Sequence, residues 1–198
     1  CKALDARAGD RILDACAAPG GKSFTLAQLT KDKAEIISAD IYQHKTKLIK
    51  DGAKRLGINS VKAVLNNAEV FNESLGSFDR ILCDVPCSGF GIIRKKPEIR
   101  YKSETNLDVL PEIQYNILNS CSKNLKMGGV LVYSTCTLNP AENGKNADRF
   151  LSEHGDFEPL EIFGSIERSI DEPKNQLTLF TGKHPCDGFF ISAFKRVR

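Results

Sequence analysis

The stretch RILDACAAPGGKS, residues 11–23, decides the expected fold of this 198-residue chain. Its apolar start over 11–15 predicts a buried strand, and its small residues lead into a helix predicted over 21–30. The free backbone N–H groups at a helix start attract phosphate and carboxylate groups. A strand that runs into such a turn is typical of parallel sheets that hold a ligand at the carboxyl ends of their strands.

Short apolar runs alternate with longer amphipathic segments along most of the chain. Such alternation is typical of successive strand–helix units, hence of a parallel sheet with helices on both faces. Gly128 and Gly129 are interpreted as the end of the third helix. Further strands are expected at 35–40, 61–65, 78–84 and 129–134, further helices at 43–56, 109–126 and 141–153, and a last antiparallel strand pair at 157–162 and 188–194. The expected architecture is α/β, a mostly parallel seven-stranded sheet with an antiparallel edge strand.

Composition limits the class of protein. With 41% hydrophobic and 27% charged residues, the chain suits one well-buried domain, and we expect 1–198 to be that domain. No apolar run approaches the ~18 residues of a membrane span, so we expect a cytoplasmic protein with no membrane partner. No obligate protein partner is inferred. Because the chain opens on Cys1 rather than Met, it is expected to be part of a longer polypeptide.

The net charge of +3 is small, but positive charge is concentrated within residues 92–102. Against Glu98 alone, this segment holds Arg94, Lys95, Lys96, Arg100 and Lys102. Such a basic loop predicts a surface that contacts phosphates, and an ordinary solvated loop is the alternative that charge leaves open. The lysines of the predicted helix at 43–56 are interpreted as a solvated face.

Two cysteines each follow an apolar run, in different contexts. Cys87 lies in DVPCSG, residues 84–89, and Cys136 lies in YSTCT, residues 133–137. Because parallel strands end at one edge of their sheet, both thiols are expected to face one crevice. Two thiols beside a turn suited to a cofactor suggest covalent catalysis.

The other cysteines give weaker signals. Seven cysteines without a C-x-x-C pair favour reduced thiols. Free cysteine is usually a buried, small apolar residue, so three thiols are interpreted as core: Cys16, Cys83 and Cys121. A zinc site would need ligands at suitable spacing, which is lacking in the set Cys83, Cys87, His184 and Cys186. No metal is therefore expected.

The turn after the first strand matches neither common nucleotide-binding motif. Gly21, Lys22 and Ser23 fit the end of G-x-x-x-x-G-K-[ST]. Cys16 stands where the first glycine of that motif belongs, which disfavours a P-loop nucleotide hydrolase. The motif G-x-G-x-x-G is also absent, so a cofactor smaller than a dinucleotide is expected.

Two polar residues follow neighbouring predicted strands. Asp40 ends the strand at 35–40, where a carboxylate can accept hydrogen bonds from ribose hydroxyls. The alternative for Asp40 is an N-cap of the helix at 43–56. Asn67 follows the strand at 61–65 and is placed to meet an adenine edge. The sequence supports equally well the alternative that Asn67 is an ordinary turn residue.

Three blocks of the sequence together resemble the Nol/Nop/Sun-type RNA cytosine-5 methyltransferases. The blocks are DACAAPGGKS at 14–23, DVPCSGFG at 84–91, and YSTCT at 133–137 with PAEN at 140–143. The resemblance extends through RKKPEIRY and DGFF, covers nearly the whole chain, and is nearest to the bacterial 16S ribosomal RNA methyltransferases. It implies the Rossmann-like fold of the class I S-adenosylmethionine-dependent methyltransferases.

The resemblance also implies which residues hold S-adenosylmethionine and its product S-adenosylhomocysteine. They are Cys16, Ala17, Ala18, Pro19, Gly20, Gly21, Lys22, Asp40, Asn67 and Asp84. Asn67 departs from the family, which usually has an aspartate at this position. The amino-terminal RNA-binding domain of near relatives is expected to lie outside this chain.

The implied reaction explains the two cysteines. C5 of cytosine is a weak nucleophile, so its methylation requires a thiolate to add at C6. By analogy with the family, Cys136 attacks and Cys87 assists the later proton loss and elimination. DNA cytosine methyltransferases place their nucleophile on a motif that resembles Pro86-Cys87, so the reversed assignment stays open. Asp84 is the candidate to engage N3 of the base, and Lys22 its carbonyl, unless Lys22 is a solvated lysine.

The expected partner is 16S ribosomal RNA in single-stranded or loop form. The target base must leave its stack before sulfur can reach C6. The RNA phosphates are expected to contact the basic loop through Arg94, Lys95, Lys96 and Arg100. Two alternatives stay open: a noncatalytic RNA-binding fragment and a transfer RNA cytosine-5 methyltransferase.

Overall fold

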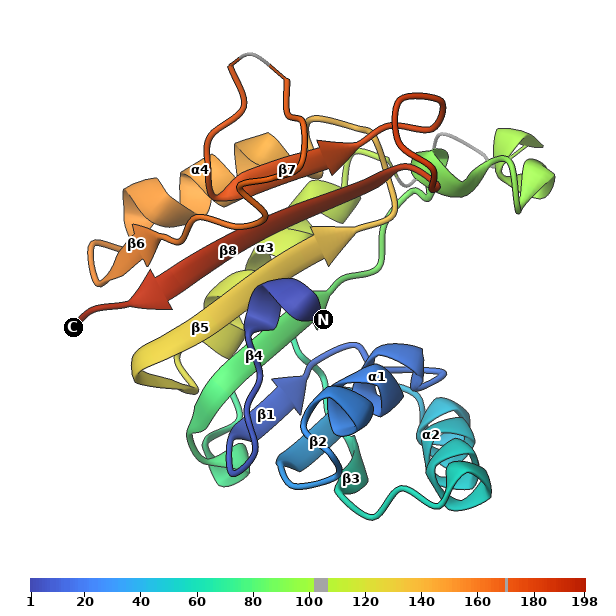
Figure 1. Ribbon diagram of the computed structural model, residues 1–198, viewed down its shortest axis with the longest axis vertical. Helices are drawn as coiled ribbons and strands as arrows, with labels where there is room; N and C mark the ends of the chain where they lie inside the picture. Colours follow the sequence, from blue (N-terminus) through green and yellow to red (C-terminus); the bar gives the residue numbers. More distant parts are fainter. Residues whose placement is uncertain (102–106, 170) are drawn as a thin grey trace.

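The computed structural model describes residues 1–101, 107–169 and 171–198. They form one mixed sheet flanked by helices (Figure 1). The strands are β1 (Arg11–Asp14), β2 (Glu35–Asp40), β3 (Val61–Leu65), β4 (Phe78–Asp84), β5 (Leu125–Thr135), β6 (Phe157–Pro159), β7 (Gln176–Leu179) and β8 (Phe189–Arg196). The helices are α1 (Gly21–Leu29), α2 (Gln43–Leu56), α3 (Leu110–Ser122) and α4 (Gly144–Glu153), with short 3-10 helices η1 (Lys2–Leu4), η2 (Glu73–Leu75), η3 (Phe90–Ile92) and η4 (Pro97–Tyr101). Within these described residues, no helix has the length and apolar character needed to cross a membrane.

The sheet is parallel through its first five strands, as predicted. β1 pairs with β2 on one side and with β4 on the other, and β3 and β5 extend the two sides. β8 then pairs antiparallel with β5. The order β3-β2-β1-β4-β5-β8-β6 changes direction between β1 and β4. Ligands of such sheets bind at this switch point, beyond the carboxyl ends of the strands.

Two short strands share the outer edge of the sheet. Both β6 and β7 pair antiparallel with β8, with Pro159 of β6 opposite Phe194 and Gln176 of β7 opposite Ser192. The seven predicted strands are present, and β7 is an eighth that lies end to end with β6 along β8. β7 is not among the predicted strands, although its four residues alternate polar and apolar side chains, because so short a run is weak evidence for a strand. Pairing with β8 and burial of Leu177 make it a strand.

The transition from α3 to β5 differs from the prediction. β5 already begins at Leu125, so Gly128 and Gly129 lie inside the strand rather than at the end of a helix. Leu125 is buried and pairs with Phe78 of β4, which starts the strand early. Gly128 has a φ of 78°, and the register against β4 shifts just after Phe78. The glycines permit an irregularity in β5, and their interpretation as a helix cap is wrong.

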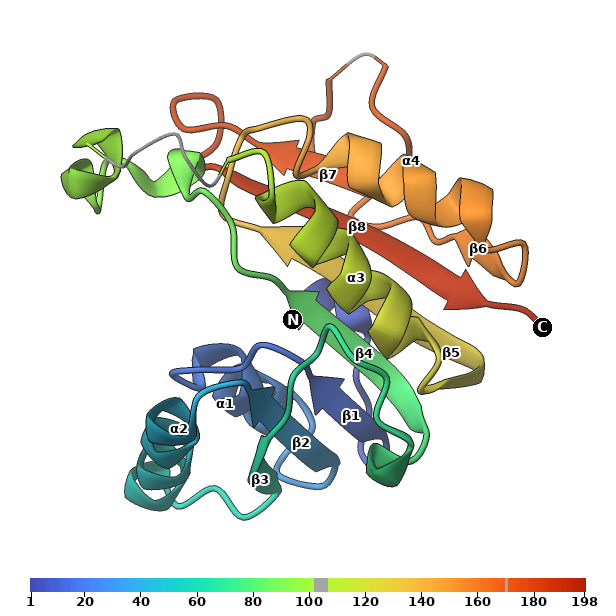
Figure 2. The same cartoon turned by 180° about the vertical axis from the view of Figure 1, so that it is seen from behind.

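Helices lie against both faces of the sheet (Figures 1 and 2), and buried apolar side chains form a cluster on each face. On the face covered by α3 and α4, the fully buried Leu118 and Phe150 pack in one cluster with Tyr133 of β5. On the face covered by η1 and α1, Leu4 and Leu26 belong to a second buried cluster. Burying one large apolar side chain stabilises a fold by roughly 1.5–3 kcal/mol. The central strands are therefore a firm base for the loops at their ends.

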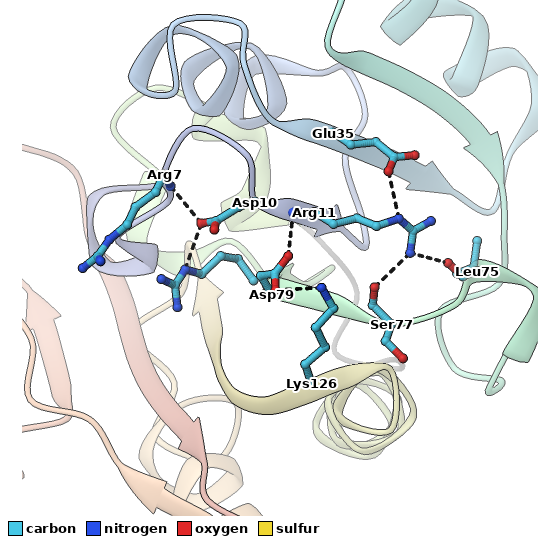
Figure 3. Close-up of polar contacts among 9 residues, drawn as sticks. Arg7, Asp10, Arg11, Glu35, Leu75, Ser77, Asp79 and Lys126 are labelled. Carbon is cyan, nitrogen blue, oxygen red and sulfur yellow. Dashed lines mark hydrogen bonds and ion pairs between the residues drawn. The ribbon is translucent and has the colours of Figure 1, made fainter.

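Charged residues tie together the edge at which the central strands begin (Figure 3). Asp79 accepts hydrogen bonds from the backbone N–H of Arg11 and from Nζ of Lys126, both at 2.8 Å. The Arg11 guanidinium donates to Glu35 and to the carbonyl of Ser77, both at 3.0 Å. These contacts join the starts of β1, β2, β4 and β5. The candidate site lies at the opposite edge, where the strands end.

Candidate active site

The carboxyl ends of β4 and β5 bring the two predicted thiols together. β4 ends at Asp84 and leads to Cys87, and β5 ends at Thr135, just before Cys136. The sulfur atoms of Cys87 and Cys136 lie 3.2 Å apart, and the backbone N–H of Cys136 donates to Sγ of Cys87 at 3.3 Å. Both residues are half-buried and line one cavity. The prediction that the two thiols face one crevice is confirmed.

The two thiols differ in acidity. The pKa of Cys136 is lowered to about 7, chiefly because the Cys87 thiol donates to it and also because Lys22 is near. The same hydrogen bond, together with burial, raises the pKa of Cys87 above its usual range. Burial and the negative charge of Asp84 act to raise the pKa of Cys136, but the net change is still a decrease. Since the thiolate is the nucleophilic form of cysteine, Cys136 is the more nucleophilic of the pair near neutral pH.

The two residues predicted to contact the target base pair with each other. Nζ of Lys22, in the first turn of α1, lies 2.5 Å from Oδ2 of Asp84 at the end of β4. Oδ1 of Asp84 accepts a hydrogen bond from Oγ of Ser134 at 2.7 Å. Both members of the ion pair are partly exposed. A base that contacts either of them would have to open or share the pair.

A cavity of about 460 Å³ opens beside the thiols. This volume lies within the range of small-molecule sites. Five of the residues predicted to hold the cofactor line it: Cys16, Ala18, Asp40, Asn67 and Asp84. Apolar side chains from the loop after β2 and from α3 complete the wall, among them Ile41, Tyr42, Ile113 and Ile117. The cavity therefore suits a ligand that has both apolar and hydrogen-bonding parts.

The turn between β1 and α1 forms a second hollow of about 300 Å³ that shares Cys16, Ala18 and Asp84 with the first. Its other lining residues include Ala17, Pro19, Gly21 and Lys22, which completes the predicted turn except for Gly20. Gly20 precedes α1 with a φ of 111°, and a Cβ there would lie 2.4 Å from the Phe24 ring. This turn requires glycine at position 20, both for its conformation and for the close approach of the ring.

Asp14 is a buried carboxylate of this second hollow that the motif reasoning did not assign. Its Oδ2 accepts a hydrogen bond from Oγ of Ser23 at 2.7 Å, and its Oδ1 is buried without a hydrogen-bond partner among the described residues. Burial raises the pKa of Asp14 to about 6. The available signal is its position as the last residue of β1, where carboxylates often meet a ligand.

Asp40 is the last residue of β2 and Asn67 follows β3, and both line the 460 Å³ cavity. Asp40 is not the N-cap of α2, because Tyr42 takes that position and Oδ1 of Asp40 accepts the Tyr42 N–H at 3.1 Å. Oδ1 of Asn67 accepts the N–H of Glu69 at 3.1 Å, which is a turn contact. The turn interpretation of Asn67 is therefore correct, and its roles in the turn and at the cavity coexist.

The remaining thiols divide into two groups. Cys83 and Cys121 are buried in the core as predicted. Cys16 packs against the edge of the core cluster but is only partly buried and also lines both hollows, so its interpretation as a core residue is correct only in part. Throughout 1–101, 107–169 and 171–198, no three His, Cys, Asp or Glu side chains are grouped so that they could hold a metal ion.

Comparison with known proteins identifies the family of the chain. The sequence profile of the family described as 16S rRNA methyltransferase RsmB/F matches residues 1–195. The chain belongs to this family. The resemblance predicted from the three sequence blocks is thereby confirmed.

Named relatives of this RsmB/F family member include both B and F types. The probable ribosomal RNA small subunit methyltransferase B of Bacillus subtilis is 42% identical over 204 aligned residues, which cover 98% of this chain and 45% of the relative. The ribosomal RNA small subunit methyltransferase F of Serratia proteamaculans is 32% identical, covering 96% of this chain and 41% of the relative. This chain spans less than half the length of both curated relatives.

Solved structures match the fold of the RsmB/F family member closely. NSun6 from Pyrococcus horikoshii, determined with SFG, superposes with a TM-score of 0.88 at 31% identity and covers 100% of this chain and 50% of that protein. A methyltransferase homologue from Pyrococcus horikoshii superposes with a TM-score of 0.84 at 30% identity and covers 98% and 64%. The class I S-adenosylmethionine-dependent methyltransferase fold expected from the sequence is confirmed.

The basic loop of the RsmB/F family member is partly engaged within the protein. Arg94 and Lys95 pair with the carboxylate of Asp187 at 3.2 and 2.6 Å, although Asp187 is only 3% exposed. Lys95 and then Arg94 hold the pKa of Asp187 below its usual range. Lys96 and Arg100 are exposed, and Lys102 lies outside the described residues. Two of the four predicted phosphate contacts thus also anchor the loop to the carboxyl-terminal segment.

The basic face of α2 mostly points to solvent, as interpreted. Lys47, Lys50, Lys54 and Arg55 are exposed. Lys45 is the exception, because it lines the 460 Å³ cavity and its Nζ lies 4.7 Å from the centre of the Tyr42 ring. The first turn of α2 therefore belongs to the candidate site, whereas the rest of the helix surface does not.

Proposed function

We propose that this chain is the catalytic domain of an enzyme that methylates C5 of a cytosine in 16S ribosomal RNA, with S-adenosylmethionine as donor. The observation that carries the proposal is the pair of thiols 3.2 Å apart in the lining of the 460 Å³ cavity. A single thiol is compatible with many functions. A thiol with a lowered pKa beside a second thiol suits covalent addition followed by elimination. Membership in the RsmB/F family supports the choice of RNA as substrate.

The two hollows fit S-adenosylmethionine. The unpartnered Oδ1 of Asp14 is an acceptor suited to an ammonium group, and Asp40 is an acceptor suited to ribose hydroxyls. The turn is free of side-chain bulk at Gly20, where a Cβ would collide with Phe24. The SFG found with NSun6 is an analogue of S-adenosylmethionine, which supports the same cofactor here. When bound, S-adenosylmethionine supplies a methyl group made electrophilic by its sulfonium sulfur.

Cys136 is the proposed nucleophile. Its thiolate adds to C6 of the cytosine, and the electron pair of the C5–C6 double bond becomes available at C5 to accept the methyl group. The C5 proton then passes to a base, either water or Cys87 in its deprotonated form. The electron pair of the C5–H bond reforms the double bond, and the S–C6 bond breaks to return Cys136 as a thiolate. Cys87 assists this last stage, since its sulfur lies within 3.2 Å of the sulfur that must be released.

The acidity of the two thiols favours this assignment over the reversed one. Cys136 has the lowered pKa, whereas Cys87 is the donor in the pair and has the raised pKa. Asp84 and Lys22 are proposed to engage N3 and the carbonyl of the base after their mutual ion pair opens. For this step Asp84 must carry a proton, because N3 of cytosine is an acceptor. A hydrogen bond donated to N3 by the protonated carboxyl makes C6 more electrophilic, so these contacts would speed the addition step.

The RNA is proposed to enter beside the basic loop as a single strand or an open loop. The base must be unstacked to reach Cys136. The exposed Lys96 and Arg100 are placed to meet phosphates, while Arg94 and Lys95 remain tied to Asp187. A positively charged surface of this kind would act through salt-dependent phosphate contacts rather than base recognition.

Release of tritium from 16S ribosomal RNA tests the proposed position of methylation. RNA that carries tritium at C5 of cytosine should lose one tritium to water for each methyl group that it gains. Methyl incorporation without tritium release would contradict methylation at C5. A chain that binds RNA but gives neither signal and shows no calorimetric binding of S-adenosylmethionine would favour a noncatalytic RNA-binding fragment. Methylation of transfer RNA but not 16S ribosomal RNA would change the substrate while keeping the chemistry.

A further inference from the structure

Glu142 is a fully buried carboxylate between the two loops that carry the thiols. The backbone N–H of Ser88 and Nε2 of Gln114 donate to its Oε2 at 2.9 and 2.8 Å. Oγ of Ser88 and Nδ2 of Asn139 donate to its Oε1 at 2.6 and 3.0 Å. Each carboxylate oxygen thus accepts two hydrogen bonds from neutral groups.

Two of the partners of Glu142 lie close to the thiols in the sequence. Ser88 follows Cys87, and its Oγ also contacts Oγ1 of Thr137, which follows Cys136, at 2.7 Å. Asn139 lies three residues after Cys136. One side chain therefore holds the loop after β4 and the loop after β5 at a fixed separation. The hydroxyl of Tyr133 fixes Glu142 in turn, because it donates to the backbone carbonyl of Glu142 at 2.5 Å.

The arrangement demands a carboxylate and not an amide. Four donors converge on two oxygens, so an NH₂ group in either position would face two donors. A buried carboxylate is costly unless hydrogen bonds compensate for lost water, and these four contacts provide that compensation. A side chain one methylene shorter would keep the charge but could not reach Ser88 and Asn139 together.

A second connection holds the same loops without Glu142. The N–H of Gly91 donates to the carbonyl of Cys136 at 2.9 Å, and the N–H of Gly188 donates to the carbonyl of Gly91 at 2.8 Å. A Cβ on Gly91 would lie 2.2 Å from the carbonyl oxygen of Gly188, so the backbones meet closely. The loops should therefore stay folded when Glu142 is altered, although their separation at the thiols would relax.

On the basis of the function proposed above, we propose that Glu142 is a positioning residue that sets the contact between the sulfur atoms of Cys87 and Cys136. It touches neither reacting sulfur, and it acts through Ser88 on one loop and through Asn139 on the other. A relaxed separation would weaken the hydrogen bond by which Cys87 keeps Cys136 acidic. Glu142 would thereby govern how much of Cys136 is thiolate at neutral pH.

The reactivity of Cys136 toward iodoacetamide as a function of pH tests this role. The groups that shift the pKa of Cys136 are chiefly Cys87, Asp84 and Lys22, all unchanged in Glu142→Gln. The variant also removes the negative charge of Glu142, which by itself would lower the Cys136 pKa, so a rise reports the altered contact between the sulfur atoms. The native midpoint is expected near pH 7, and that of Glu142→Gln should move toward the ~8.5 of an unperturbed cysteine. At pH 7 this corresponds to alkylation slower by about five- to fifteen-fold, read peptide by peptide in a mass spectrometer.

The matched control is Asp79→Asn. It also turns a carboxylate that accepts two hydrogen bonds into an amide, but at the opposite edge of the sheet (Figure 3). Its Cys136 midpoint should stay at the native value. Glu142→Asp serves if Glu142→Gln does not fold, and it should move the midpoint in the same direction while keeping the charge.

A folded Glu142 variant with the native Cys136 midpoint would overturn the proposal. So would an equal shift in Asp79→Asn, because the effect would then be general destabilisation. Alkylation needs neither RNA nor cofactor, so the positioning role and the methyltransferase function are tested apart. A shifted midpoint in a protein that never methylates RNA would support Glu142 and count against the proposed function.

Discussion

Lys22 and Asp84 neutralise each other across the candidate site, with Nζ and Oδ2 2.5 Å apart. The two residues have opposite effects on the neighbouring thiol, because the positive charge of Lys22 lowers the pKa of Cys136 and the negative charge of Asp84 raises it. The two charges therefore act in opposite directions on Cys136, and each can be removed separately by mutation.

Replacing Asp84 should separate thiol reactivity from catalysis. In Asp84→Asn the Cys136 pKa should fall, so alkylation by iodoacetamide at pH 6 should become severalfold faster. Methyl transfer should nevertheless drop by roughly 10²-fold or more, as for the loss of a group that assists proton transfer. Lys22→Met should instead slow alkylation at pH 7. Parallel gains in alkylation and methyl transfer in Asp84→Asn would contradict its role at the base.

Asp40 should dominate binding of the cofactor's ribose. A hydrogen bond to a charged group contributes about 1.5–3 kcal/mol, so Asp40→Asn should weaken S-adenosylmethionine binding by roughly ten- to hundredfold. Titration calorimetry measures this directly, and Asp79→Asn at the far edge of the sheet should bind with native affinity. Native affinity in Asp40→Asn would remove Asp40 from the cofactor site.

The pH dependence of stability should report on Asp14. Its pKa is about 6 in the folded chain against 3.8 for an ordinary aspartate, so the folded state binds more protons between these values. Its contribution to the free energy of unfolding is therefore full below pH 4 and is lost as the pH rises toward 6. From pH 4 to pH 7, the stability of Asp14→Asn relative to native should rise by on the order of 2 kcal/mol.

Urea unfolding of both proteins at pH 4 and pH 7 measures this difference. Asp14→Asn should also bind S-adenosylmethionine more weakly than the native protein, because it lacks the buried carboxylate of Asp14. A difference in unfolding free energy that is the same at both pH values would mean that Asp14 titrates normally. That result would remove the support that stability gives to a raised pKa for the buried Asp14 carboxylate.

The four predicted phosphate contacts of the basic loop should fall into two classes. Neutralising Lys96 and Arg100 should reduce the slope of log affinity against log salt by roughly one for each lost phosphate contact, with the melting temperature unchanged. Neutralising Arg94 and Lys95 should also lower the melting temperature, because the nearly buried Asp187 loses its partners. Filter binding at several salt concentrations, with thermal melts, separates the classes. Identical behaviour of the two pairs would contradict this division.

Local sequence pattern accounts for most of the fold and for the meeting of the thiols. The strand ends at Asp84 and Thr135 follow from apolar runs, and parallel pairing then brings Cys87 and Cys136 to one edge. What it misses depends on contacts between distant segments. For example, β5 begins early because Leu125 pairs with Phe78 of β4. The local sequence around Gly128 gives no information about that pairing.

The site shows the same division between local pattern and distant contact. Their positions at strand ends predict Asp84 and Asp40 near the cavity, and the family resemblance implies Lys22, but the contacts that these side chains make are known only from the structure. Glu142 looks like an ordinary acidic residue before a helix, and only the convergence of Ser88, Gln114 and Asn139 on it marks it out. Arg94 and Lys95 likewise pair with a residue that is distant in the sequence. Arg94 and Asp187, for example, are 93 residues apart.

The central claim is that Cys136 bonds to the base and Cys87 releases it. The most direct measurement is a denaturing gel of protein mixed with labelled 16S ribosomal RNA and S-adenosylmethionine. Cys87→Ala should accumulate a covalent protein–RNA band, whereas Cys136→Ala should give neither that band nor methyl transfer. A band in Cys136→Ala that vanishes in Cys87→Ala would reverse the assignment, and free turnover by both variants would contradict covalent catalysis by these thiols.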